Sequence, residues 1–132
     1  MNRTLTITRL LCLLLCLQSA TALAQETTDS PLVGSWGGPL VIGEEDLGLI
    51  FNFTLNDGKY SASMISDGLG IYGMPADRVR VNGLMLTINI NRLDVEFTGT
   101  LRFDETGEEL LRIDANWFQG SEMVPVVLRP AD

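Results

Sequence analysis

The chain has 132 residues, of which 17 are acidic, 9 are basic and none is histidine, so its formal net charge is −8 at pH 7. A surface this acidic repels phosphate backbones and anionic lipid headgroups, which argues against nucleic-acid and membrane-surface partners. Without histidine, the chain has no base for a serine or cysteine triad and no imidazole ligand for a metal.

Residues 1–24 have the three parts of a secretory signal. Arg3 and Arg9 precede an apolar run over residues 10–17, and Ala22 and Ala24 frame a small-x-small cleavage site. The run is shorter than the roughly 20 residues of a membrane span, and no later segment approaches that length. We therefore predict cleavage after Ala24, a periplasmic or secreted protein, and no membrane span.

Both cysteines, Cys12 and Cys16, lie in the segment to be removed. The exported chain would then form no disulfide and offer no thiolate for catalysis or metal binding. Lipid attachment at Cys16 is the alternative. Leu15 disfavours it, because the residue before the cysteine of a lipid-attachment site is expected to be small. Loss of Arg3 and Arg9 leaves 7 of the 9 basic residues against 17 acidic ones, a net charge of about −10.

Residues 25–31 are polar and aperiodic and end in proline, which predicts a flexible lead-in. Residues 32–132 suit one antiparallel β domain. Trp36, near its start, lies among glycines that permit bends, so we expect a kinked first strand. From Leu47 to Leu55 every second residue is apolar, the pattern of a strand with one buried face.

Several turn signals follow. Asn56-Asp57-Gly58 tolerates positive φ and predicts a hairpin to a strand over 59–65. Asn82-Gly83 predicts a second hairpin after the strand 77–81. The next inward face would consist of Leu84, Leu86, Ile88 and Ile90.

A turn at 91–93 leads to residues 94–103, the most plainly amphipathic strand of the chain. Its expected inward residues are Val95, Phe97, Gly99, Leu101 and Phe103, and those of the strand 109–118 are Leu111, Ile113, Ala115 and Trp117. In the last run, 123–129, Pro125 cannot donate to a ladder and indicates an edge or a barrel seam. The fold class is therefore all-β, either a single antiparallel up-and-down barrel, lipocalin-like, or a strongly curved sheet of about eight strands.

Residues 66–75 are neither a clean alternating strand nor a short turn, which makes this stretch the candidate functional loop. Its glycines and proline are expected to set its shape. The inward aromatic residues are expected to pack the core, with a binding cavity as the alternative. The shape-setting residues are Gly70, Gly73 and Pro75, and the candidate ligand or partner contacts are Trp36, Ser66, Tyr72, Met74, Trp117 and Gln119.

No catalytic, cofactor or metal-binding residues are assigned. A Gly-x-Ser-x-Gly elbow is absent, and the acidic residues gather in turns, where surface charge is the commoner explanation. Neither acidic turn has the spacing of a calcium loop.

Five segments resemble a known family, namely 32–40, 66–77, 97–101, 117–120 and 124–128. They resemble the all-β domain that precedes the catalytic α/β-hydrolase domain in many secreted bacterial serine hydrolases. Asp67, Gly68 and Leu69 stand where that family has proline, aspartate and glutamine, and Ala115 stands where it usually has glycine. Ser66 and the three shape-setting residues keep their places.

The resemblance implies a stand-alone accessory module, because the catalytic residues of those hydrolases belong to their other domain. The expected function is that of a non-catalytic exported domain that binds a small apolar ligand or a partner protein. A structural or interaction protein with a filled core, acting through residues 66–75, is the alternative. A hydrolase is disfavoured.

Overall fold

The computed structural model of the chain describes residues 30–131. The predicted signal peptide, residues 1–24, and residues 25–29 of the predicted lead-in lie outside the described residues. Within 30–131 no helix has the length and apolar character to cross a membrane.

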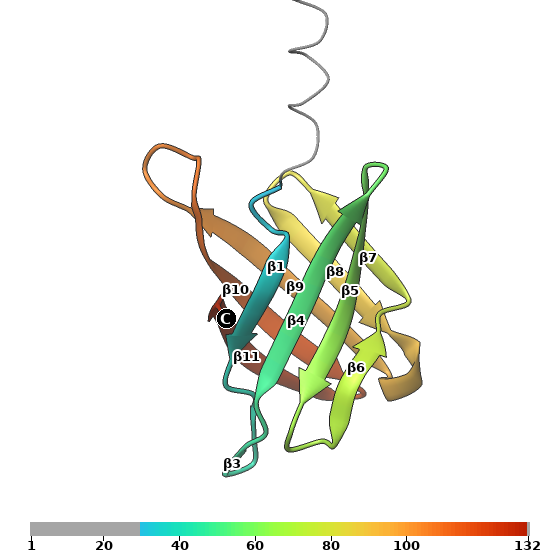
Figure 1. The fold of residues 1–132 in the computed structure, drawn as a ribbon. Helices are drawn as coiled ribbons and strands as arrows, with labels where there is room; N and C mark the ends of the chain where they lie inside the picture. The colour runs from blue at the N-terminus through green and yellow to red at the C-terminus, as the bar shows by residue number, and fades with distance from the viewer. Residues whose placement is uncertain (1–29, 132) are drawn as a thin grey trace, which may run out of the picture.

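Nine strands form one antiparallel sheet that curls into a half-barrel (Figure 1). The all-β prediction of a strongly curved sheet is confirmed, with one more strand than the eight expected. The strands are β1 (Gly34–Gly38), β4 (Leu49–Asn56), β5 (Lys59–Ser66), β6 (Ile71–Pro75), β7 (Arg78–Asn82), β8 (Met85–Ile90), β9 (Val95–Phe103), β10 (Leu110–Gln119) and β11 (Glu122–Pro130). A small separate hairpin, β2 (Val41–Ile42) with β3 (Glu45–Asp46), lies between β1 and β4, and the 3-10 turn η1 (Asn91–Leu93) joins β8 to β9.

The strand order is β6-β5-β4-β1-β11-β10-β9-β8-β7. The strands β6 and β7 are consecutive in the chain but stand at opposite ends of the sheet. Two neighbouring residues link these ends. The Ala76 N–H donates to the Ala62 carbonyl oxygen of β5 at 2.9 Å, and the Asp77 N–H donates to the Asn89 carbonyl oxygen of β8 at 2.8 Å. A strand that passes from one sheet region to another makes a corner of this kind. The β6–β7 connection therefore bends the sheet back on itself.

The opposite seam of the half-barrel lies between β1 and β11. Trp36 pairs with Pro130 and Gly37 pairs with Arg129. Pro125 lies farther along β11, where β10 is the strand neighbour among the described residues. A proline is tolerated there because its missing N–H faces no partner strand.

The inward faces follow the predicted alternation in most strands. The Phe51 ring lies 5.1 Å from that of Phe97 and 6.0 Å from that of Phe53, centroid to centroid. Residues from both halves of the sheet thus pack in one core. The largest fully buried side chains are Trp117, Phe51, Phe53, Phe97, Leu40, Leu49, Met64, Leu86, Ile88, Ile90, Ile113 and Leu128.

Two residues predicted to point inward are exposed. Leu111, 41% exposed, lies at an irregularity in the β9–β10 register between Leu110 and Arg112. Such a bulge inserts one residue and changes which side chains face the core, so Leu110 is buried in its place. Leu84, 55% exposed, belongs to the hairpin loop itself.

The hairpin turns explain the position of Leu84. The predicted hairpin turn at 56–58 is present, and Asp57 and Gly58, with φ of 52° and 74°, form its two-residue loop between β4 and β5. In the second hairpin Asn82 pairs with Met85, so the loop is Gly83-Leu84, not Asn82-Gly83. Gly83 has φ of 61°, and a glycine at the first loop position suits a type II′ turn.

The prediction of a loop over residues 66–75 is wrong for the C-terminal half of this segment, which is a strand. Ser66 is the last residue of β5, residues 67–70 make a tight turn, and Ile71–Pro75 form β6. The sequence pattern conceals this strand because Gly73, with φ of 107°, lies in a bulge opposite Met64 and Ile65 and interrupts the alternation. Pro75 is compatible with β6 because β6 is an edge strand.

Candidate functional site

The two tryptophans among the candidate contacts are part of the core. Trp36 and Trp117 are 4% and 0% exposed. The indole N–H of Trp36 donates to the Leu32 carbonyl oxygen at 2.9 Å, and that of Trp117 donates to Oε1 of Gln119 at 3.3 Å. Nε2 of Gln119 in turn donates to the carbonyl oxygen of Leu93, in η1, at 2.9 Å. These three side chains hold the fold together.

The other candidate contacts lie on β5 and β6. Ser66 is 1% exposed, and its hydroxyl donates to the Leu47 carbonyl oxygen at 3.0 Å. Met74 is partly buried against the core. Tyr72, 74% exposed, is the one member of this group that a ligand or partner can reach freely. The structure therefore does not bring the six candidates together at one site.

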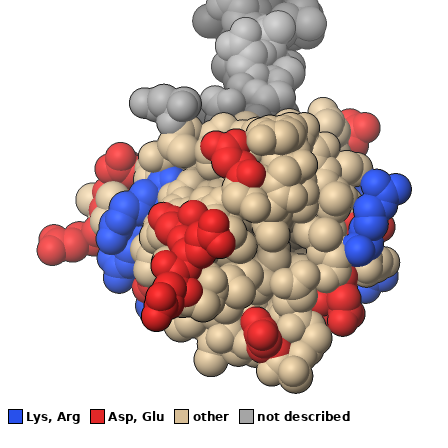
Figure 2. All heavy atoms as spheres, turned by 90° about the horizontal axis from the view of Figure 1, so that it is seen from below, with Lys and Arg blue, Asp and Glu red and all other residues tan. Residues whose placement is uncertain are grey.

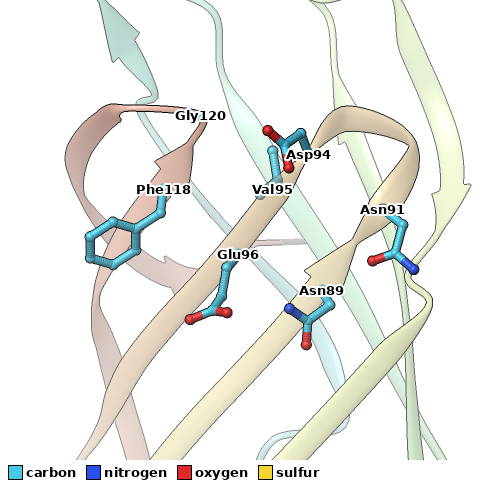
Figure 3. A pocket seen from close by; sticks show the side chains of 7 residues that line it. All are labelled: Asn89, Asn91, Asp94, Val95, Glu96, Phe118 and Gly120. Atoms are coloured by element: carbon cyan, nitrogen blue, oxygen red, sulfur yellow. The ribbon is translucent and has the colours of Figure 1, made fainter.

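A site that the sequence patterns did not indicate lies on the outer face of β7 to β10. The pairing register places Arg78 opposite Asn89, Asn89 opposite Glu96, and Glu96 opposite Phe118. Paired residues on one face of a sheet have Cβ atoms about 5 Å apart. These four side chains consequently form one row across four strands, of which Figure 3 shows Asn89, Glu96 and Phe118.

Two shallow hollows, of about 320 and 480 Å³, flank this row. They share three residues, Asn89, Asn91 and Glu96, so they are adjacent, and we call the two together the outer hollow. Its other lining residues are Asp94, Val95, Phe118 and Gly120 on one side and Asp77, Arg78, Arg80 and Thr87 on the other.

Hydrogen bonds to backbone groups of η1 and its flanking residues hold one end of the outer hollow in place. Oδ2 of Asp77 accepts a hydrogen bond from the Asn91 N–H at 2.6 Å, which ties the β6–β7 corner to η1. Asp94 closes η1 in the left-handed region, with φ of 56°, and its N–H donates to the Asn91 carbonyl oxygen at 3.1 Å. The contact of Gln119 with Leu93 holds η1 from the other side.

The side chains of the outer hollow have few partners inside the protein. Within residues 30–131, Arg78, Arg80 and Glu96 take part in no ion pair, and the Asn89 amide makes no side-chain hydrogen bond. Elsewhere on this face the arginines are paired. Arg102 and Arg112 both contact Asp114, at 3.0 and 2.9 Å. The groups of the outer hollow are thus free to bind a ligand.

Charge of both signs surrounds the outer hollow. Asp94 lies on one side of it, Asp77 lies on the other side with Arg78 and Arg80, and Glu96 lines both. The end of the molecule that holds β3 (Figure 1) is seen face-on in Figure 2, where acidic side chains face outward while Lys and Arg lie at the margins. Asp94 and Glu96 repel an anion at the η1 side, whereas at β7 the charges of both signs are balanced.

Asp114 shows how ion pairing acts on this face. Arg102 and Arg112 are directly opposite in the β9–β10 register, an unfavourable like-charge pair that Asp114 relieves. The hydrogen bond from Arg112 lowers the pKa of Asp114 below its ordinary value of 3.8, partial loss of hydration opposes this, and Arg102 lowers it further.

Asp114→Asn is expected to lower the free energy of unfolding at pH 7 by less than about 1 kcal/mol, because the pair is solvent-exposed. The lowered pKa means that the carboxylate stabilises the fold above pH 3.8 and that this contribution is lost as the pH falls through the lowered pKa. Urea denaturation at pH 7 and at pH 2 checks this. The difference between variant and parent should be smaller at pH 2 than at pH 7, and an equal difference at both pH values would contradict the ion-pair explanation.

Comparisons with protein-family models, curated proteins and solved structures gave no match to this chain. The hydrolase-associated resemblance stays a prediction.

Metal and acid–base chemistry find little support in the site. Within residues 30–131 no group of three or more Asp, Glu, Cys or His side chains is arranged to hold a metal ion. Two carboxylates of the outer hollow, those of Asp94 and Glu96, belong to exposed residues. A general acid at neutral pH usually needs a shielded carboxyl group, and neither of these two is shielded.

One signal in the sequence bears on the outer hollow. The alternation over 94–103 already places Glu96 on the outward face. Its neighbours Arg78, Asn89 and Phe118 come from three other strands, and only the pairing register brings them together. Local patterns contain no information on that register.

Proposed function

We propose that the chain is an exported, non-catalytic binding domain that holds a small polar ligand in the outer hollow. The observation that carries the proposal is the row of Arg78, Asn89, Glu96 and Phe118, in which the polar members have no side-chain partner within residues 30–131. Export rests on the predicted signal in residues 1–24.

The ligand is proposed to bind outside the half-barrel because the inward aromatic residues pack against one another. Phe51 and Phe97 are in ring contact, and both, like Trp117, are 0% exposed. An apolar ligand in the interior would have to displace these contacts. The outer hollow instead offers amide, carboxylate, hydroxyl and guanidinium groups beside one exposed ring, the mixture that orients a polar molecule.

A protein partner bound through β6 is the second candidate function. Tyr72 is 74% exposed and pairs with Ile65 on β5, which pairs in turn with Ile50 on β4. This row gives the outer face of β4 to β6 an aromatic and aliphatic surface, and exposed tyrosines are common anchors of protein interfaces.

The test is a titration of the isotope-labelled exported chain with a panel of small polar molecules, followed by amide NMR. We expect the shifts to map to Thr87, Asn89, Asn91 and Glu96, and Glu96→Ala to weaken the affinity at least about tenfold. Tyr72→Ser is the matched control, an exposed residue of β6 outside the lining of the outer hollow, and should bind as the parent does.

Two outcomes would contradict the proposal. One is the absence of shifts in the outer hollow with any member of the panel. The other is loss of binding in Tyr72→Ser with retention in Glu96→Ala, which would favour the β6 surface instead.

A further inference from the structure

The outer hollow combines three chemical groups in a fixed order. Phe118, 41% exposed, stands on β10, the carboxylate of Glu96 lies next to it on β9, and the amide of Asn89 follows on β8 (Figure 3). On the far side of Phe118, Met123 of β11 is its cross-strand partner and is 55% exposed. From β11 to β8 the row therefore begins with two apolar side chains and continues with a carboxylate and an amide, which form hydrogen bonds.

We propose that the ligand of the outer hollow is a neutral saccharide, whose ring packs on Phe118 while its hydroxyl groups bind Glu96 and Asn89. This inference rests on the proposed function. A sugar ring has an apolar face of C–H groups and a rim of hydroxyls, and each hydroxyl both donates and accepts. The C–H face can pack on an aromatic ring, and the hydroxyl groups can form hydrogen bonds with adjacent carboxylate and amide groups.

The charge of the outer hollow favours a neutral ligand. Asp94 and Glu96 stand at the Phe118 side, so a phosphate or carboxylate ligand is repelled there. At the other side Arg78 and Arg80 stand beside Asp77 and Glu96, so neither sign of charge is favoured there. Hydroxyl groups, in contrast, can donate to Glu96 and accept from Arg78.

The length of the row suits more than one sugar residue. From Phe118 on β10 to Arg78 on β7 the row crosses four neighbouring strands. At the usual spacing this is about 14 Å. Because the hollow is shallow and open to solvent, we expect a dissociation constant in about the millimolar range.

The experiment titrates the exported chain with neutral tri- and tetrasaccharides of glucose, mannose, galactose and N-acetylglucosamine, and in parallel with inorganic phosphate and with a dicarboxylate. We expect amide shifts around Asn89 and Glu96 with at least one saccharide. Phe118→Ala should weaken that binding at least about tenfold, while Phe118→Tyr should retain it. Rescue by another aromatic residue separates stacking from a structural effect, and thermal melting checks that each variant is folded.

The controls separate the two proposals. Tyr72→Ala, which removes an exposed ring of β6 that does not line the outer hollow, should bind saccharide as the parent does. Binding of phosphate or the dicarboxylate at Asn89 and Glu96 without binding of any saccharide would overturn the saccharide inference and leave the proposed function standing. Saccharide binding that Phe118→Ala leaves unchanged would also overturn it. No binding of any probe would overturn both.

Discussion

Trp117→Ala is expected to lower the free energy of unfolding by about 3–5 kcal/mol, the usual cost of deleting a large buried aromatic side chain. Trp117 is 0% exposed, and β10, to which it belongs, lies between β9 and β11. The substitution removes core contacts and also the indole partner of Gln119, which holds η1 through Leu93. A domain of this size is stable by only about 5–15 kcal/mol, so a large part of its stability would be lost.

Urea denaturation measures this loss, with the fluorescence of Trp36 as the remaining tryptophan signal. Phe118→Ala is the matched control, because Phe118 is the next residue of the same strand and faces outward. We expect its effect on the free energy of unfolding to be within about 1 kcal/mol. Equal losses in the two variants would contradict the assignment of Trp117 to the core and Phe118 to the surface.

Gly38→Ala is expected to destabilise the seam between β1 and β11. A Cβ at Gly38 would lie 2.1 Å from the Val127 carbonyl oxygen, far closer than van der Waals contact allows. Because the obstructing atom is backbone, β1 and β11 must move apart, and overpacking of this kind costs about 1–3 kcal/mol. Urea denaturation gives the total loss, and hydrogen exchange shows whether the β1 amides lose protection first.

Gly37→Ala provides the comparison for Gly38→Ala. A Cβ at Gly37 would lie 3.1 Å from Cγ1 of Ile50, 3.3 Å from Cβ of Ala131 and 3.3 Å from the Leu49 carbonyl oxygen. These contacts are tight but less severe than the 2.1 Å contact at Gly38, so the loss of stability should be the smaller of the two. The reverse order would mean that the β1–β11 contact is looser than the structure shows.

The strands were predictable from sequence wherever one face is buried and the alternation is uninterrupted. Leu86, Ile88 and Ile90 on β8, and Val95 and Phe97 on β9, are buried as expected. This works because a strand with one buried side has a period of two residues, and period is a local property.

Bulges and turn types limited that prediction. The bulge near Leu111 and the one at Gly73 each change the alternation, and both depend on the neighbouring strand. With Asn82-Gly83 as the hairpin loop, Arg78 would pair with Thr87, but the observed loop pairs it with Asn89. A shift of this kind decides which outward residues are neighbours.

The candidate site illustrates the same limit. Large aromatic residues such as Trp36 and Trp117 were predicted as contacts, yet they are buried, because apolar surface in a curled sheet is mostly used for the core. Tyr72 was identified and is exposed. The outer hollow was missed, since each of its residues is unremarkable in its own segment.

By itself, the sequence determined the β class, most inward faces, the first hairpin and the expectation of an exported chain without histidine. Each of these depends on residues close together in the chain. Only the tertiary structure decided that Arg78, Asn89, Glu96 and Phe118 share one row. Their proximity arises from the pairing of four strands, and that pairing is set by core packing, bulges and turn geometry over the whole sheet.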